Sequence, residues 1–165
     1  MTHAFALRCG TGPAGADRPR VLAPPPLVYL PALGAGFALQ ALLSDIAPPD
    51  RAVRVLGYAL VVAGGALAGS FVRAFLRART SIDFGRATTL VTTGPYRLSR
   101  NPGYVGMALV YAGIAVASGA WLAFATVVPA LVAIDRCVIR GEERHLEKVF
   151  GDEYRAYTRR VRRWL

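Results

Sequence analysis

The stretch from Gly94 to Gly106 holds polar side chains at the expected start of an apolar helix. It reads G-P-Y-R-L-S-R-N-P-G-Y-V-G. The Gly-Pro and Asn-Pro pairs each favour a turn, and Pro102 fits the first turn of a helix, where a missing N–H costs nothing. Free backbone N–H groups at that helix end would then lie beside Arg97 and Arg100. This combination predicts a site for an anionic group, such as a carboxylate or a phosphate.

Residue types alone leave a second interpretation of this stretch open. Arg97 and Arg100 could reach phospholipid headgroups, and Tyr96 and Tyr104 could belong to an aromatic belt at a membrane interface. The stretch would then anchor a helix end and do no chemistry.

A second polar block, residues 140–157, begins with the neighbouring carboxylates Glu142 and Glu143. Carboxylates near a bilayer surface are commonly solvated or paired with nearby arginines. Alternatively, they hold a cation or accept hydrogen bonds from a ligand. Beyond them, apolar and aromatic residues recur every three or four positions, which predicts an amphipathic helix interrupted at Gly151; these residues are Leu146, Val149, Phe150, Tyr154 and Tyr157.

The elements that must position these blocks are apolar segments. The chain is 54% hydrophobic and its mean hydropathy is +0.37. A soluble domain of this size is usually less hydrophobic on average, because its surface must carry polar groups. From Gly103 to Ile134 no residue is charged, and one helix of that length would measure roughly 48 Å, too long for a single crossing of a hydrocarbon core about 30 Å thick. A break at Ser118-Gly119-Ala120 would turn it into a tight hairpin. We therefore expect four transmembrane helices, at about 27–43, 53–75, 104–117 and 121–139.

The third of these segments is shorter than the roughly 20 residues that a crossing normally needs. It could tilt little, thin the bilayer or end below the far headgroups. A re-entrant hairpin is the alternative.

The formal charge of +10 comes from 19 arginines and the single Lys148. The arginines gather in the linker from Arg73 to Asn101 and in the segment from Asp135 onward, which four crossings place on one side together with the N-terminus. An excess of arginine marks the cytoplasmic side of membrane proteins. We therefore expect no nucleic-acid binding, but an all-α integral protein of the inner (cytoplasmic) membrane whose N- and C-termini are cytoplasmic.

The remaining segments complete the expected domain organisation. Residues 1–26 are rich in Gly and Pro and predict a flexible cytoplasmic N-terminal tail, followed by one membrane domain over residues 27–165. The run from Arg159 to Leu165 suits an anionic membrane surface. No metal site is expected, because the histidines and cysteines lie far apart in the sequence; they are His3, Cys9, Cys137 and His145.

Together the two polar blocks resemble the isoprenylcysteine carboxyl methyltransferase family, especially its small bacterial members, and the related phospholipid methyltransferases. The pattern G-P-Y-x-x-x-R-[HN]-P-x-Y-x-G corresponds to residues 94–106. The pattern E-E-x-x-L-x-x-x-F-G-x-x-Y-x-x-Y corresponds to residues 142–157. The resemblance covers about residues 80–165, and the first two helices by architecture only.

In that family S-adenosylmethionine is bound at the cytoplasmic face, by the loop before the hairpin and by the helix after it. The resemblance therefore implies a cofactor site built from segments 90–106 and 140–157, and a lipid-like acceptor that enters from the bilayer between helices. The implied cofactor-binding residues are Val91, Gly94, Tyr96, Arg100, Asn101, Pro102, Tyr104, Glu142 and Glu143.

Asn101 departs from the best-known eukaryotic members, which have histidine at this position. Asparagine can donate and accept hydrogen bonds but does not ionise. A role in cofactor placement survives this change, whereas a role in proton transfer does not.

The implied reaction is an in-line methyl transfer, in which positioning and desolvation of the two partners dominate. As catalytic residues, Arg100 would align the carboxylate of the acceptor or of the cofactor, and Glu143 would balance the positive charge of the cofactor. A prenylated acceptor with a cysteine carboxylate is favoured, and a carboxylate nucleophile needs no base. The alternatives are N-methylation of a phospholipid or another amine, methylation of a phenolic lipid, an NADPH-dependent enzyme like the membrane sterol reductases, and a non-catalytic membrane scaffold.

Overall fold

The computed structural model describes residues 25–43, 47–79 and 89–165, and in these ranges it is helical without any strand. The expected N-terminal tail therefore lies almost wholly outside the described residues. The described elements are α1 (Pro25–Leu43), α2 (Arg51–Ala78), the short 3-10 helix η2 (Gly94–Arg97), α3 (Pro102–Ser118), α4 (Ala123–Ala133), the π-helix η3 (Ile134–Ile139) and α5 (Arg140–Thr158).

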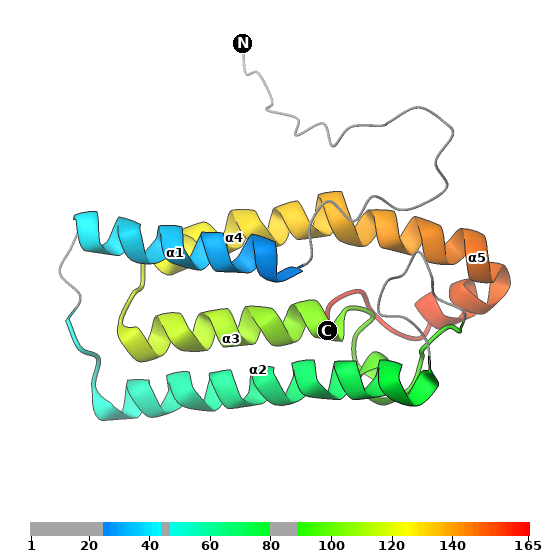
Figure 1. The fold of residues 1–165 in the computed structure, drawn as a ribbon, viewed down its shortest axis with the longest axis horizontal. Coiled ribbons are helices and arrows are strands. Elements are labelled where there is room, and N and C mark those ends of the chain that lie inside the picture. Colours follow the sequence, from blue (N-terminus) through cyan, green and yellow to red (C-terminus); the bar gives the residue numbers. More distant parts are fainter. Residues whose placement is uncertain (1–24, 44–46, 80–88) are drawn as a thin grey trace, which may run out of the picture.

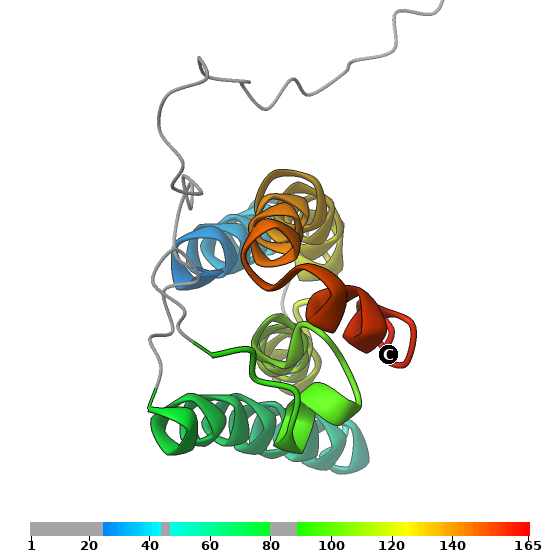
Figure 2. The same ribbon diagram turned by 90° about the vertical axis from the view of Figure 1, so that its right-hand side faces the viewer.

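The four long helical rods lie side by side and alternate in direction (Figure 1). The α1 helix packs along α4, and α2 packs along α3 (Figure 2). At one end of the molecule α1 begins, α2 ends, α3 begins and α4 continues through η3 into α5 (Figure 1). Consequently, the two polar blocks of the sequence emerge at the same end of the bundle.

Glycines bring α2 and α3 into close contact. A Cβ atom added at Gly64 would lie 2.5 Å from the carbonyl oxygen of Gly106, and one added at Gly57 would lie 2.5 Å from the backbone nitrogen of Ala117. Small residues of this kind let helix backbones approach closely. Because Gly57 lies near the start of α2 and Ala117 near the end of α3, α3 runs beside most of α2.

A buried hydroxyl group joins the other helices in the bundle interior. The Tyr111 hydroxyl of α3 donates toward the carbonyl oxygen of Ala123 at 2.9 Å and that of Ala32 at 3.1 Å. It also lies 2.8 Å from the Thr126 hydroxyl. Tyr111 is 2% exposed, but its hydroxyl group has hydrogen-bond partners and is not left unsatisfied. These bonds connect α3 to both α1 and α4.

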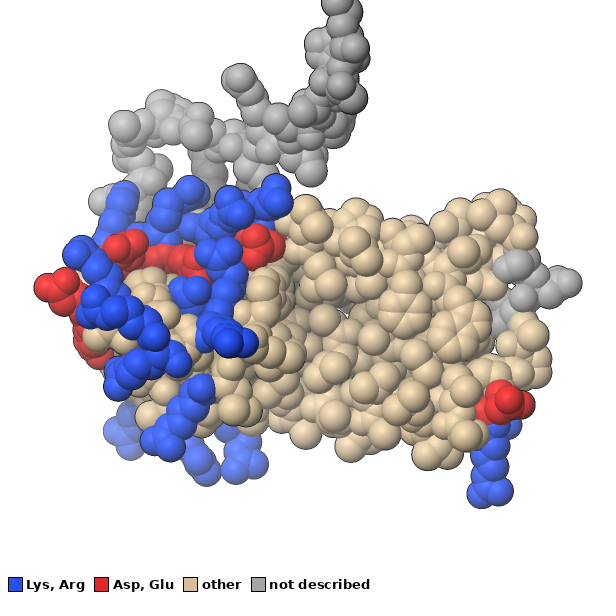
Figure 3. All heavy atoms as spheres, turned by 180° about the vertical axis from the view of Figure 1, so that it is seen from behind, with Lys and Arg blue, Asp and Glu red and all other residues tan. Residues whose placement is uncertain are grey.

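Charged residues gather at the α5 end of the molecule and leave its middle uncharged (Figure 3). Of the described helices, α2 is the one that is long and apolar enough to cross a membrane, while residues 27–43 and α3 form shorter apolar helices. Only 11% of the most apolar window of α2 is buried inside the protein. An apolar surface this open is what a bilayer would cover, and a soluble monomer rarely leaves one exposed.

Candidate functional site

The loop before α3 turns one aromatic side chain inward and one arginine outward. Gly94 begins η2 with φ 62°, a left-handed conformation that favours glycine. The turn that follows buries Tyr96 and leaves Arg97 exposed. Nothing in the sequence distinguishes Arg97 from Arg100, but their surroundings in the fold differ. Arg97 is exposed, whereas Arg100 is mostly buried and faces α5.

On the opposite wall, α5 bends back on itself at Gly151. This residue has φ 51° and ψ −120° inside the helix, a backbone conformation that essentially only glycine adopts. The predicted interruption is confirmed. After the bend, Tyr154 and Tyr157 are buried, and the Tyr157 hydroxyl donates to the Tyr96 carbonyl oxygen at 2.8 Å. The bend therefore closes α5 onto the loop before α3.

The two polar blocks line a common pocket together with Phe75 of α2. Six of the implied cofactor-binding residues line it: Val91, Tyr96, Arg100, Asn101, Glu142 and Glu143. The remaining three implied residues do not line the pocket but lie next to residues that do. Gly94 starts η2, Pro102 starts α3, and the Tyr104 hydroxyl donates to the carboxylate of Glu142. The enclosed volume is about 30 Å³, enough for little more than one water molecule.

Glu142 is a buried carboxyl group. It is 5% exposed, and the Tyr104 hydroxyl donates to its Oε1 at 3.0 Å. Within the described residues, no cation pairs with it. Burial raises the pKa of Glu142 from 4.5 to about 7; the bond from Tyr104 opposes this shift and the charge of Glu143 adds to it. A cation in the pocket would stabilise the ionised form.

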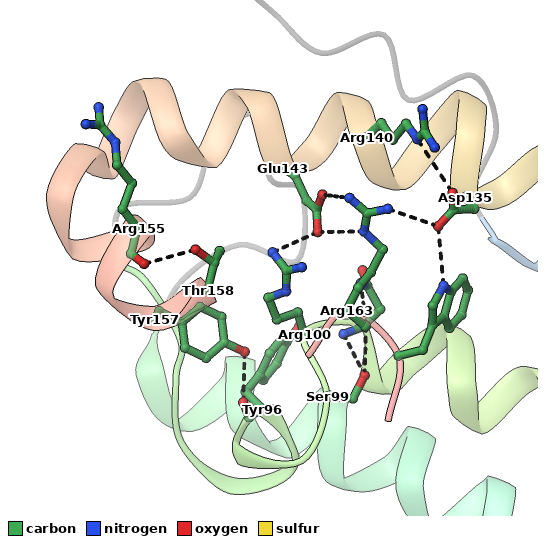
Figure 4. Close-up of polar contacts among 12 residues, drawn as sticks. Tyr96, Ser99, Arg100, Asp135, Arg140, Glu143, Arg155, Tyr157, Thr158 and Arg163 are labelled. Atoms are coloured by element: carbon green, nitrogen blue, oxygen red, sulfur yellow. Dashed lines mark hydrogen bonds and ion pairs between the residues drawn. The ribbon is translucent and has the colours of Figure 1, made fainter. Parts of the chain in front are cut away.

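Glu143, by contrast, is held by two arginines that approach from different segments (Figure 4). Arg100 Nη1 lies 3.0 Å from its Oε1. Arg163 grips both oxygens, with Nε 3.1 Å from Oε1 and Nη2 2.6 Å from Oε2. Such a two-pronged pair fixes the orientation of the carboxylate as well as its charge. The charge of Glu143 is therefore compensated inside the protein.

The C-terminal residues contribute one side chain to the site. In the run from Arg159 to Leu165, which is expected to suit a membrane surface, Arg163 pairs with Glu143 and lies 3.5 Å from Asp135 Oδ1. One arginine among many carries no signal of its own in the sequence. The site residues that the sequence left out of the cofactor set are Phe75, Thr89, Leu90, Leu146, Tyr154, Tyr157 and Arg163, of which Leu146, Tyr154 and Tyr157 stand in the second motif.

A wider, basic hollow of about 600 Å³ adjoins the pocket. It shares Arg100, Glu143 and Tyr154 with the pocket and opens to solvent. Its remaining wall is rich in guanidinium groups, from Arg140, Arg144, Arg155 and Arg163. A buried carboxyl, an aromatic wall and an arginine cluster thus meet at one end of the bundle.

Comparison with known proteins agrees with this arrangement. Residues 52–153 match the family described as phospholipid methyltransferase, a range that includes nearly all of α2, the whole of α3 and α4, and most of α5. The chain belongs to the phospholipid methyltransferase family. Members are membrane-associated methyltransferases of the phospholipid and isoprenylcysteine type, and they generally use S-adenosylmethionine.

A shorter relative matches part of this chain. It is an uncharacterized protein of Haemophilus influenzae, 39% identical over 62 residues, which are 38% of this chain and 98% of the relative. No solved structure matches the chain significantly. The resemblance to the family is confirmed at the level of the broad family, and the isoprenylcysteine subgroup stays a prediction.

Proposed function

We propose that this protein is an S-adenosylmethionine-dependent methyltransferase that acts on a lipid-like acceptor at the membrane surface. The observation that carries the proposal is Glu142, a buried carboxyl with no cation partner among the described residues, in a pocket walled by aromatic rings. S-adenosylmethionine, when bound, supplies a methyl group activated by a positively charged sulfur. A carboxylate and aromatic faces are the groups that suit such a cation.

We propose that Glu142, rather than the expected Glu143, balances the positive charge of the cofactor. Glu143 is already neutralised by Arg100 and Arg163, so a further positive charge gains little from it. In our proposal, Glu142 ionises to meet the positive charge of the cofactor, and Glu143 holds Arg100 in place. Tyr96, Tyr154 and Tyr157 exclude water from the reacting groups, which strengthens electrostatic interactions there.

The enclosed volume sets a condition on binding. About 30 Å³ does not admit a nucleoside. The pocket walls must separate, and the hollow of about 600 Å³ beside them offers space into which the pocket can extend.

Arg100 supports an acceptor or cofactor group of negative charge. Its Nε is buried and has no hydrogen-bond partner among the described residues, and further arginines line the adjoining hollow. An anionic group entering there would find donors already oriented. This favours an acceptor carboxylate, as in a prenylated cysteine, over an uncharged phenol; a phospholipid amine beside its phosphate is the second candidate.

We also propose that the four helices cross the membrane with the α5 end in the cytoplasm. In α2, 18 uncharged residues lie between Arg54 and Arg73, a length of about 27 Å that matches the hydrocarbon core. The arginine-rich end then faces the side on which positive charge is enriched. An acceptor embedded in the bilayer would reach the pocket from the headgroup level.

The test is methyl transfer by purified full-length protein in lipid. With radiolabelled S-adenosylmethionine and a lipid extract, we expect label in a lipid product, at least about tenfold less with Arg100→Ala, and within about twofold of wild type with Arg97→Ala, whose side chain is exposed. S-adenosylhomocysteine should raise the melting temperature and NADPH should not. No labelled product together with stabilisation by NADPH would refute the proposal.

A further inference from the structure

The last five residues, 161–165, form a C-terminal strap that lies across the site. The backbone N–H of Arg100 donates to the carbonyl oxygen of Arg162 at 3.0 Å. The carbonyl oxygen of Arg163 accepts from Ser99 Oγ at 3.2 Å and from Asn101 Nδ2 at 3.0 Å. Three consecutive residues of the loop before α3 are therefore bonded to the strap.

The side chains of the strap bind the opposite wall. Arg163 forms the two-pronged pair with Glu143 of α5, and the Trp164 indole N–H donates to Asp135 Oδ1 of η3 at 3.3 Å. The Trp164 ring also packs against the buried core of the bundle. The strap thus connects the loop before α3 with the helix after α4, the two segments that build the pocket (Figure 4).

We infer that Arg163 is a positioning residue of the cofactor site, acting through Glu143 and through its own backbone carbonyl group. The inference rests on the proposed function. Arg163 fixes the Glu143 carboxylate, which holds Arg100 at the pocket, and its carbonyl oxygen holds the Asn101 amide. Without the Arg163 guanidinium, Glu143 keeps a single cation and its carboxylate rotates more freely.

Binding of S-adenosylhomocysteine, measured by calorimetry on the full chain in detergent, tests this role. We expect Arg163→Gln to weaken binding by about tenfold, because a charge-assisted, two-pronged pair is lost. The matched control is Arg159→Gln, which removes the charge of an exposed arginine outside the pocket and the hollow and should change binding by less than about twofold. Equal affinities of both variants would refute the inference alone, whereas no binding by the wild type would refute the proposed function.

A double-mutant cycle separates positioning from general stability. In a Glu143→Gln background, adding Arg163→Gln should weaken binding by less than about twofold further, because the two residues act as one unit. Arg163→Lys keeps the positive charge but loses the paired N–H groups of the guanidinium. It should therefore bind more tightly than Arg163→Gln and less tightly than wild type. Independent, multiplying effects would show that Arg163 acts through stability and would contradict the inference.

A second variant applies if Arg163→Gln fails to fold. Trp164→Phe keeps a smaller aromatic ring in the core and removes the bond to Asp135. We expect about threefold weaker binding of S-adenosylhomocysteine, since a single hydrogen bond anchoring the strap is lost. Unchanged binding by this variant would overturn the inference.

Discussion

Glu142 and Glu143 are neighbours in the sequence with opposite surroundings in the fold. Glu143 lies between two guanidinium groups, whereas Glu142 accepts one bond from a tyrosine in a buried position. Burial disfavours the charged form of Glu142 and raises its pKa. One carboxylate is therefore fixed by the protein, and the other is available to a ligand.

The raised pKa of Glu142 makes stability depend on pH. Between pH 4.5 and about 7 the folded protein keeps a proton that the unfolded chain releases, so the folded state loses up to about 3 kcal/mol as pH rises through this range. Glu142→Gln stays neutral and should lack this loss. We expect the variant to melt higher than wild type at pH 8 and by a smaller margin at pH 5, in thermal scans without ligand.

The same residue should distinguish the cofactor from its product. At pH 8, Glu142→Gln should weaken S-adenosylmethionine binding by about tenfold and S-adenosylhomocysteine binding by less than about threefold, because only the former carries a positive sulfur. Calorimetry with both ligands measures this. The exposed Glu153, which lines neither the pocket nor the hollow, supplies the control Glu153→Gln, which should change neither affinity. Equal losses for both ligands would place Glu142 against another part of the cofactor.

At the scale of the elements, the contact between α2 and α3 depends on missing side chains. An added Cβ at Gly64 meets backbone atoms of α3, while one at Gly65 meets nothing within 4 Å. Gly64→Ala should therefore destabilise the protein by about 1–3 kcal/mol, and Gly65→Ala should be neutral or slightly stabilising, since alanine is the better helix former. Melting temperatures of the two variants measure the difference, and equal values would contradict the helix pairing.

The helices could be predicted from the sequence because long uncharged runs have few other stable forms. The break at Ser118-Gly119-Ala120 could be predicted because the uncharged run is too long for one membrane crossing. In the structure, Gly119 ends α3 with φ 75°. The bend at Gly151 was expected as an interruption, but its direction was not, since that depends on ψ. The role of Arg163 was missed because eight arginines follow Asp135 in sequence and only the folded chain shows which one meets Glu143.

At the scale of the whole molecule, the alternation of the helices determines where the chemistry lies. Two helices separate the N-terminal end of α1 from the first polar block, and two more separate that block from the second. Even numbers of helices return the chain to the same end, so both blocks meet beside α5 (Figure 1). The uncharged middle of the molecule suits the bilayer interior, and the charged end suits its surface (Figure 3).

The central claim is that one cofactor lies between the loop before α3 and the segment from α5 to the C-terminal strap. Ultraviolet crosslinking of radiolabelled S-adenosylmethionine to the full-length protein, followed by peptide mapping, tests it most directly. We predict label in peptides from residues 89–104 and 140–163, and its loss when excess unlabelled S-adenosylhomocysteine is added. Label confined to peptides from the second half of α1 or from the first half of α2, at the opposite end of the bundle, would contradict the claim.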